Sequence, residues 1–93
     1  MILETDIEEI LAREDDEIEF KCDFIGGKPK PNIEWLFNEF SLEHFDDKYI
    51  ENDYSLIVNN LNLNDSGNYT CILTNEYHKP QQRIFSLIVF GMN

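Results

Sequence analysis

The sequence predicts an all-β fold, an antiparallel sandwich or barrel, on three observations. Apolar residues recur with period two rather than 3.6, as they do in half-buried strands. Clusters of Gly, Pro, Asn and Asp separate the apolar runs at short intervals. No segment has a convincing helical period. At this length we expect a single domain over residues 1–93.

The first strong strand is expected in residues 18–24, where every second residue is apolar. The Gly- and Pro-rich segment 26–31 ends this strand, because glycine frees the backbone and proline fixes it. The next strand is expected to point three side chains inward: Ile33, Trp35 and Phe37.

The middle of the chain is less regular. Residues 38–47 are polar, and we expect a short edge strand and a loop there. Residues 48–50 predict another short strand. Residues 54–58 predict a stronger one, with Leu56 and Val58 facing inward.

Two long strands are expected near the C-terminal end. The first places Tyr69, Cys71 and Leu73 on the core side. A hairpin turn around residues 76–82 then leads to a final strand over residues 83–90. Its expected inward residues are Phe85, Leu87 and Val89.

The final strand is apolar on its outward side as well, at Ile84, Ile88 and Phe90. An exposed row of this kind marks an interface or an aggregation hazard. Alternatively, a neighbouring strand covers it, and we expect partial cover from the N-terminal strand.

The net charge of -12 makes nucleic acid and anionic membrane surfaces unfavourable partners, because both carry negative charge. Residues 4–19 contain nine acidic residues against Arg13 alone. We interpret this segment as a solvated edge that resists aggregation. The alternative is a docking stripe for a basic protein partner. No stretch is apolar for long enough to insert into a membrane.

No catalytic residue, cofactor or metal site is expected. Phosphate-loop and Ser-His-Asp arrangements are both missing from the sequence. Cys71 sits inward on a strand, where burial would raise its pKa and make it unreactive. The acids around His44 and in residues 14–17 could suggest a cation, but loop acids commonly face water.

One set of residues resembles the immunoglobulin fold in both type and spacing. The set is Cys22, Trp35, Leu56 and the motif Asp65-x-Gly67-x-Tyr69-x-Cys71. The short stretch between Trp35 and Leu56, with Gly27-x-Pro29-x-Pro31 before the Trp, resembles the intermediate (I-set) class. That class occurs in neural adhesion molecules, receptor ectodomains and muscle proteins of the titin and twitchin kind. The resemblance implies a sandwich of two sheets with Greek-key connections.

The resemblance also implies roles for individual residues. Cys22 and Cys71 would form an inter-sheet disulfide, and closing a loop of that length would stabilise the fold by ~4 kcal/mol. Tyr69 would turn its hydroxyl back to the backbone near Asp65, and Asp65 would pair with Lys48. Gly67 would take a backbone conformation that a side chain would obstruct.

Two loops depart from the family pattern. The usual Asn-x-x-Gly turn after the second cysteine is replaced by residues 75–80, and the usual glycine before the first cysteine's strand is replaced by residues 14–16. The first of these loops is a candidate for individual specificity. The candidate partner-binding residues are Glu14, Asp15, Asp16, Tyr77, His78, Ile84 and Ile88.

The sequence therefore suggests a non-catalytic protein-binding module with neighbouring domains in a larger chain. An extracellular or cell-surface module is preferred, because the implied disulfide favours an oxidising compartment. Two glycosylation triplets, at Asn64 and Asn68, favour the same side of the membrane. The alternative is a cytosolic scaffold domain of muscle type. The negative charge, the lack of a signal peptide after Met1 and the Tyr54-Ser55-Leu56 pattern favour that alternative.

Overall fold

Ten strands and one 3-10 turn follow one another in the computed structural model, which describes residues 1–42 and 47–91. The elements are β1 (Ile2–Leu3), β2 (Glu8–Arg13), β3 (Ile18–Lys21), β4 (Phe24–Ile25), β5 (Asn32–Phe37), β6 (Phe40–Ser41), β7 (Tyr49–Asn52), β8 (Ser55–Val58), η1 (Leu63–Asp65), β9 (Gly67–Asn75) and β10 (His78–Phe90).

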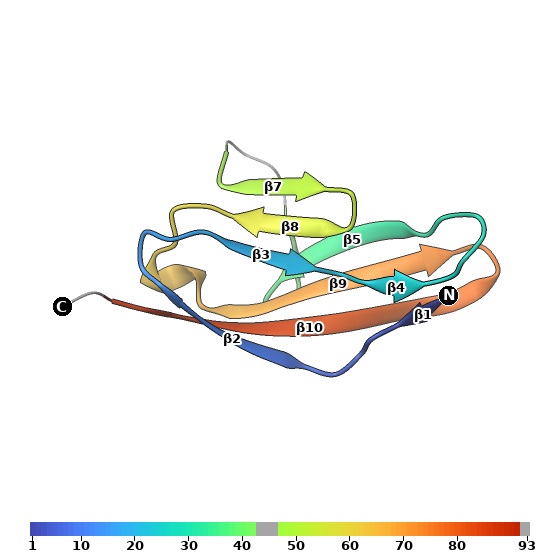
Figure 1. Cartoon of the computed structure of the whole chain (residues 1–93), viewed down its shortest axis with the longest axis horizontal. Coiled ribbons are helices and arrows are strands. Elements are labelled where there is room, and N and C mark those ends of the chain that lie inside the picture. The colour runs from blue at the N-terminus through green and yellow to red at the C-terminus, as the bar shows by residue number, and fades with distance from the viewer. Residues whose placement is uncertain (43–46, 92–93) are drawn as a thin grey trace.

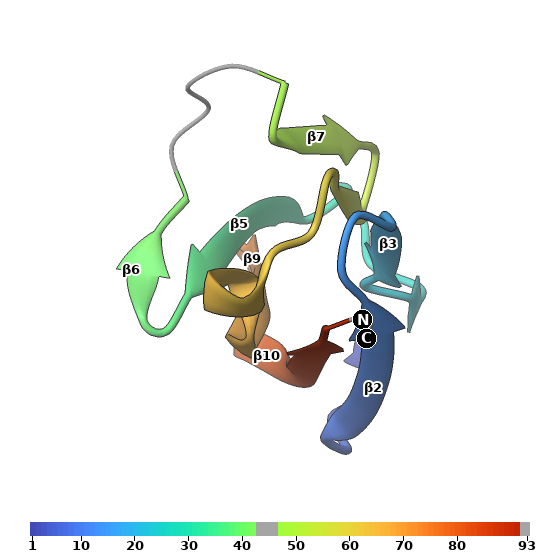
Figure 2. The same ribbon diagram turned by 90° about the vertical axis from the view of Figure 1, so that its left-hand side faces the viewer.

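The strands form two facing layers (Figures 1 and 2). One layer is a five-stranded sheet in the order β2-β10-β9-β5-β6. The other contains the three-stranded sheet β3-β8-β7, and β4 follows β3 along the chain and pairs with β1. The chain crosses between the layers from β1 to β2, from β2 to β3, from β4 to β5, from β6 to β7 and from β8 to β9. The predicted all-β sandwich is confirmed.

The core lies between the layers and is built from the inward side chains of the alternating strands. The buried apolar residues of the described chain are Leu3, Phe20, Cys22, Trp35, Leu56, Val58, Leu61, Tyr69, Cys71, Leu73, Phe85, Leu87 and Val89. Burying each large side chain in this set stabilises the fold by about 1.5–3 kcal/mol before conformational entropy is subtracted. The predicted inward positions of the five main strands lie in this core or pack partly buried against it.

A disulfide between Cys22 and Cys71 joins the two layers, and both cysteines are 0% exposed. Trp35 lies opposite Cys71 in the β5–β9 ladder. The Phe20 ring lies 6.5 Å from the Trp35 ring and 4.8 Å from the Tyr69 ring, between their centroids. The indole Nε1 of Trp35 is buried without a hydrogen-bond partner in the described residues. The Trp35 side chain therefore stabilises the fold by packing around the disulfide and not by hydrogen bonding.

The N-terminal segment contributes one strand to each layer. β1 pairs antiparallel with β4, and β2 then pairs parallel with β10, so the sandwich is not purely antiparallel. The Gln81 side chain of β10 holds β1 in place. It accepts a hydrogen bond from the Leu3 backbone N–H (3.0 Å) and donates one to the Met1 carbonyl oxygen (3.1 Å). This amide therefore connects the two layers where the chain changes from one to the other.

The expected bounds of the last strand were wrong at its beginning. β10 starts at His78, five residues before the predicted Arg83, and the turn is confined to Glu76 and Tyr77. The β9–β10 register shifts between His78 and Gln81. Pro80 lies inside this irregular step, and because proline has no backbone N–H it cannot donate to a regular ladder. The proline made the sequence resemble a turn, whereas the strand continues past it.

Candidate functional site

The corner before β9 is held by a buried tyrosine. The Tyr69 hydroxyl donates a hydrogen bond to the backbone carbonyl oxygen of Asp65 over 2.7 Å, and Tyr69 is 0% exposed. Burial raises the pKa of the Tyr69 hydroxyl far above its ordinary value, and the negative charge of Asp65 raises it further. The hydroxyl therefore stays protonated and remains a donor across the physiological pH range.

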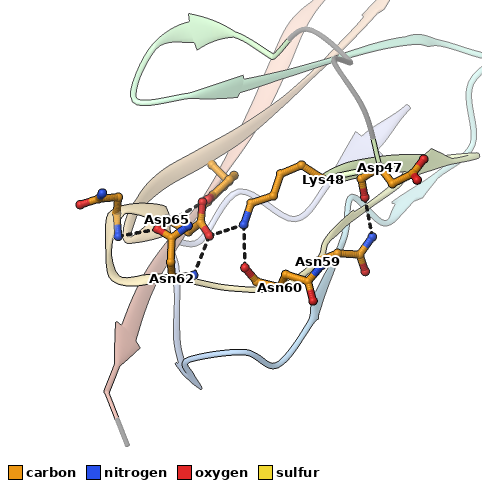
Figure 3. A network of polar contacts seen from close by, with 8 residues as sticks. Asp47, Lys48, Asn59, Asn60, Asn62 and Asp65 are labelled. Atoms are coloured by element: carbon orange, nitrogen blue, oxygen red, sulfur yellow. Dashed lines mark hydrogen bonds and ion pairs between the residues drawn. The ribbon is translucent and has the colours of Figure 1, made fainter.

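The Asp65 carboxylate is the centre of a polar network (Figure 3). Its Oδ2 accepts from Lys48 Nζ at 2.6 Å and from the Asn62 backbone N–H at 2.8 Å. Lys48 Nζ also donates to the Asn60 carbonyl oxygen at 2.9 Å. The Asn62 side chain accepts from the η1 backbone in return, which completes a capping box. The network ties the start of β7 to the turn before β9, as the resemblance implied for Lys48 and Asp65.

Gly67 is required where it stands. Its φ is +152°, and a Cβ built there would lie 2.6 Å from Asn38 Oδ1 and 2.8 Å from Phe37 Cε1. Both distances are shorter than any side chain tolerates without a shift of its neighbours. Glycine thus allows the β5–β6 turn to pack directly on the beginning of β9.

The reactive groups of the corner are already engaged within the chain. Its carboxylate is neutralised by the lysine, its tyrosine is fully buried, and Cys71 is already bonded to Cys22. Within the described ranges 1–42 and 47–91, no group of three or more His, Cys, Asp or Glu side chains could hold a metal ion. The possible cation segment around His44 lies outside the described residues.

The acidic turn between β2 and β3 is held by its backbone. The Asp15 N–H donates to the Leu61 carbonyl oxygen at 2.7 Å, and the Leu61 N–H donates to the Asp16 carbonyl oxygen at 2.9 Å. Asp15 has a φ of +74°, the left-handed conformation that glycine adopts most easily and that Asp tolerates. The side chains of Asp15 and Asp16 are exposed and Glu14 is half-buried. The turn therefore presents carboxylates to solvent on a fixed backbone.

The β9–β10 turn exposes Tyr77, which is 72% accessible, and His78 beside it. Asn75 stabilises the turn from within. Its Oδ1 accepts from the Tyr77 backbone N–H at 2.7 Å, and its Nδ2 donates to the Pro29 carbonyl oxygen at 2.6 Å. Asn75 keeps the first position of the usual Asn-x-x-Gly turn, His78 stands at the glycine position, and the side chain of Tyr77 is left exposed to solvent.

The candidate partner-binding loops do not form one site. The Glu14 N–H donates to the Phe90 carbonyl oxygen at 2.9 Å, which places the acidic turn beside the end of β10. Tyr77 precedes the beginning of the same thirteen-residue strand. The two loops lie at opposite ends of the long axis (Figure 1). A single small ligand cannot contact both, so they belong to separate surfaces.

The outward face of the five-stranded sheet carries three exposed apolar side chains, which we name the apolar row: Leu11, Ile88 and Phe90. They are 71%, 54% and 44% exposed. Leu11 and Ile88 are direct neighbours in the β2–β10 pairing. The expected partial cover of Ile84, Ile88 and Phe90 by the N-terminal strand is not met at Ile88 and Phe90, which are exposed, whereas Ile84 is half-buried. β2 pairs edge to edge with β10 and extends the outward face instead of lying over it.

The two candidate glycosylation residues lie in different local structures. Asn64 is exposed within η1, and Asn68 is exposed near the start of β9. Ile84 is half-buried on the same outward face as Asn68. It lies closer to the beginning of β10 than Ile88 and Phe90 of the apolar row.

Sequence reasoning missed four residues that shape these surfaces: Leu11, Asn38, Asn62 and Gln81. The alternation in residues 8–13 places Leu11 outward, and this signal was available. Asn62 stands three residues before Asp65, the spacing of a capping box, so it could also have been identified. Asn38 and Gln81 act through contacts with distant segments, which no local pattern reports.

No helix in the described part of the chain has the length and apolar character needed to cross a membrane.

Several comparisons with known proteins agree on the family. The family model described as the immunoglobulin I-set domain matches residues 2–89. Netrin receptor UNC5D of Rattus norvegicus is 35% identical over 66 residues, which cover 69% of this chain and 7% of the receptor. The Mus musculus receptor of the same name matches equally. The chain thus matches only a small part of the length of these receptors.

Solved structures give the same fold. The tandem immunoglobulin repeats of Dlar have a TM-score of 0.84 and 22% identity, over 98% of this chain and 48% of that one. An I-band fragment of titin has a TM-score of 0.77 and 26% identity, over 97% of this chain and 31% of the fragment. A netrin receptor and titin are thus both similar to this chain. The family model covers nearly the whole chain, and the chain belongs to the immunoglobulin I-set family.

Proposed function

We propose that the chain is one domain of a larger extracellular or cell-surface protein, that it binds other proteins and that it catalyses nothing. Its mechanism is surface complementarity on a rigid frame. The two-layer core and the disulfide fix the strands, so that an outward face can meet a partner without rearranging. The similarity to a netrin receptor and the buried disulfide support the extracellular setting.

The observation that carries the proposal is the apolar row of Leu11, Ile88 and Phe90. Large apolar side chains that adjoin one another on an exposed face are typical of interaction surfaces. The row lies on the outermost pair of strands of its sheet, β2 and β10, where a partner can approach the face and the edge together. We therefore assign partner contact first to this margin of the sheet.

The acidic residues would set the charge of the partner. Glu8 and Glu9 lie on β2, and the turn with Asp15 and Asp16 lies beside the end of β10. Within this group Glu8 is paired with Arg83 at 3.3 Å. We infer that the remaining negative charge steers a basic protein partner toward the apolar row. The same charge disfavours nucleic acid and anionic lipid.

Neighbouring domains are part of the proposal. β1 and the end of β10 lie at opposite ends of the molecule (Figure 1), so further domains can join without covering either sheet. The relatives support this arrangement, because the matched segment is a small fraction of each receptor.

Netrin is the first probe for binding, because the similar proteins are named as its receptors. Association is measured on immobilised wild-type domain and on the double variant Leu11→Ser with Ile88→Ser. Ile50→Ser is the matched control, since Ile50 is 44% exposed on β7 in the other layer. We expect the wild-type domain and the control to bind netrin and the double variant not to bind it. The association rate should fall as the salt concentration rises.

Absence of netrin binding would remove netrin as the ligand. Binding that the double variant retains would remove the apolar row as the contact surface. An association rate indifferent to salt would remove the steering role of the acids.

A second function remains, a cytosolic structural domain of a muscle-type filament. The I-band fragment of titin favours it, at 26% identity over 97% of this chain. In that setting both cysteines would be reduced thiols. The thiol state in the natural source therefore separates the two functions.

A further inference from the structure

Asn68 stands on the outward face of the five-stranded sheet with its side chain exposed. Within the described residues, its side-chain amide makes no hydrogen bond, whereas its backbone is held on both sides by Asn38. The Asn68 N–H donates to Asn38 Oδ1 at 2.9 Å, and the Asn38 N–H donates to the Asn68 carbonyl oxygen at 2.8 Å. The backbone is therefore fixed and the amide remains available.

A groove of about 530 Å³ lies directly beside this amide. It is lined by Leu36, Asn38, Glu39, Asn68, Thr70 and Ile84, together with Gln82. Thr70 pairs with both Leu36 and Ile84 across the ladders, so two apolar side chains flank it. The groove thus combines an apolar floor with amide, hydroxyl and carboxylate groups at its sides. Sugars present the same mixture, because their ring faces are apolar and their hydroxyls are polar.

The sequence Asn68-Tyr69-Thr70 is an acceptor triplet for N-linked glycosylation. We propose that Asn68 carries an N-linked oligosaccharide whose first sugars lie in this groove, over Leu36 and Ile84. The inference rests on the proposed extracellular setting. It assigns the central part of the outward face to sugar and leaves its margin at the apolar row free for protein.

The chemistry is a transfer from a lipid-linked diphosphate oligosaccharide, the donor of the secretory pathway. Asn68 Nδ2 forms a bond to C1 of the first N-acetylglucosamine. The bond from C1 to the diphosphate oxygen breaks, so the lipid diphosphate leaves with the bonding electrons. The amide nitrogen loses one proton, which passes to the solvent and the departing diphosphate. No oxidation or reduction takes place.

The other triplet, Asn64-Asp65-Ser66, does not line this groove and does not lie in an extended strand. Asn64 lies in η1, a turn stabilised by a capping box between Asn62 and Asp65, three residues apart. Such local contacts form early, because they close only a short loop. Ser66 Oγ also accepts from the Val89 N–H at 2.9 Å. The Asn68 triplet is extended, and its pairing partners on β5 and β10 are more than thirty residues earlier or more than ten residues later in the chain. These contacts therefore form later than those of η1. We therefore assign the glycan to Asn68 and not to Asn64.

The test uses the whole chain secreted from mammalian cells, with intact mass measured before and after treatment with peptide N-glycosidase. Wild type and Asn64→Gln should each lose the mass of one glycan. Asn68→Gln and Thr70→Val should carry none. The valine variant keeps the shape of Thr70 and leaves Asn68 in place, so it removes only the acceptor triplet. A poorly folded Asn68→Gln variant would then not obscure the result.

The placement of the sugar is tested by methyl NMR spectra of glycosylated wild type and of wild type produced without glycan in bacteria, since peptide N-glycosidase would leave a charged Asp at position 68. Methyl signals of Leu36 and Ile84 should differ between the two samples, and those of Leu11 should not. A glycan that persists in Asn68→Gln or Thr70→Val would overturn the assignment, and unchanged Leu36 and Ile84 signals would overturn the placement.

Different results would overturn the glycan and the proposed extracellular recognition function. A wild-type domain with an intact disulfide and no sugar would overturn the glycan alone. Two free thiols in the protein from its natural source would overturn the extracellular setting and the glycan with it.

Discussion

The corner before β9 and the edge strand β2 are built in opposite ways. In the corner, Asp65 is 6% exposed and Tyr69 is 0% exposed, and each makes a short hydrogen bond within the chain. In β2, Leu11 is 71% exposed and the strand has a ladder partner on one side only. The corner uses its polar groups internally, while the edge presents its side chains to solvent.

This difference explains why family resemblance identifies the fold better than the function. Residues such as Tyr69 and Gly67 satisfy packing and hydrogen-bonding requirements that are internal to the fold. Leu11 satisfies no internal requirement and is therefore free to match a particular partner. Substitutions in the corner should therefore lower the stability of the domain without changing partner binding. Substitutions in β2 should weaken partner binding without changing stability.

The largest expected loss of stability follows from a substitution on β5, the strand that pairs with β9 after the corner. Trp35→Ala should lower the free energy of unfolding by ~3–5 kcal/mol, because it leaves a cavity around the disulfide between the two layers. Urea denaturation monitored by circular dichroism gives the value. A folded variant with near wild-type stability would contradict the account of the core.

Asp65→Asn should cost about 1–3 kcal/mol, because it removes the charge that pairs with Lys48 at 2.6 Å and weakens the acceptor of the Asn62 N–H. Asp16→Asn makes the same change of charge at an exposed position and is the matched control. Equal stabilities of the two variants in denaturation would show that the corner network contributes nothing.

Tyr69→Phe should cost about 1–2 kcal/mol at neutral pH, since the Asp65 carbonyl oxygen loses its buried donor. The cost should depend on pH in a defined direction. The folded state raises the pKa of Tyr69, so the unfolded chain loses this proton first, above a pH of about 10. This contribution to wild-type stability is complete below that pH and is lost as the pH rises further.

The stability gap between wild type and Tyr69→Phe should therefore be constant below a pH of about 10 and narrow above it. Denaturation curves in alkaline buffers measure the gap. A gap that widens with rising pH would show that the burial of this hydroxyl has been misjudged.

The smallest expected effect on stability is at the edge. Leu11→Ser should change the free energy of unfolding by no more than about 0.5 kcal/mol, because the side chain is already largely in solvent. Thermal denaturation is the measurement. A loss comparable with that of Asp65→Asn would mean that Leu11 stabilises the sheet and that the contrast between edge and corner is false.

Much of the frame could be predicted from the sequence, because alternation and turn residues are local signals. Inward positions such as Phe20, Leu56 and Leu73 followed from period two, and the corner roles of Tyr69 and Asp65 followed from the family motif. These features repeat wherever the fold occurs, so a short pattern is sufficient to reveal them.

The rest depended on contacts between distant segments. The parallel pairing of β2 with β10 is set by the crossing of the N-terminal segment between layers, which no periodicity describes. Pro80 suggested a turn but lies within an irregular step of β10. Asn38 and Gln81 have partners 30 and at least 78 residues away. The groove beside Asn68 also needs three strands to exist.

The most direct test of the extracellular recognition module is the thiol state of Cys22 and Cys71 in the protein from its natural source. Both are 0% exposed, so alkylation must be carried out in denaturant, because the native fold would hide free thiols and bonded cysteines alike. We predict no alkylation until a reductant is added, and then modification of both cysteines, as measured by mass spectrometry. Full alkylation without reductant would contradict the extracellular setting and favour a cytosolic filament domain.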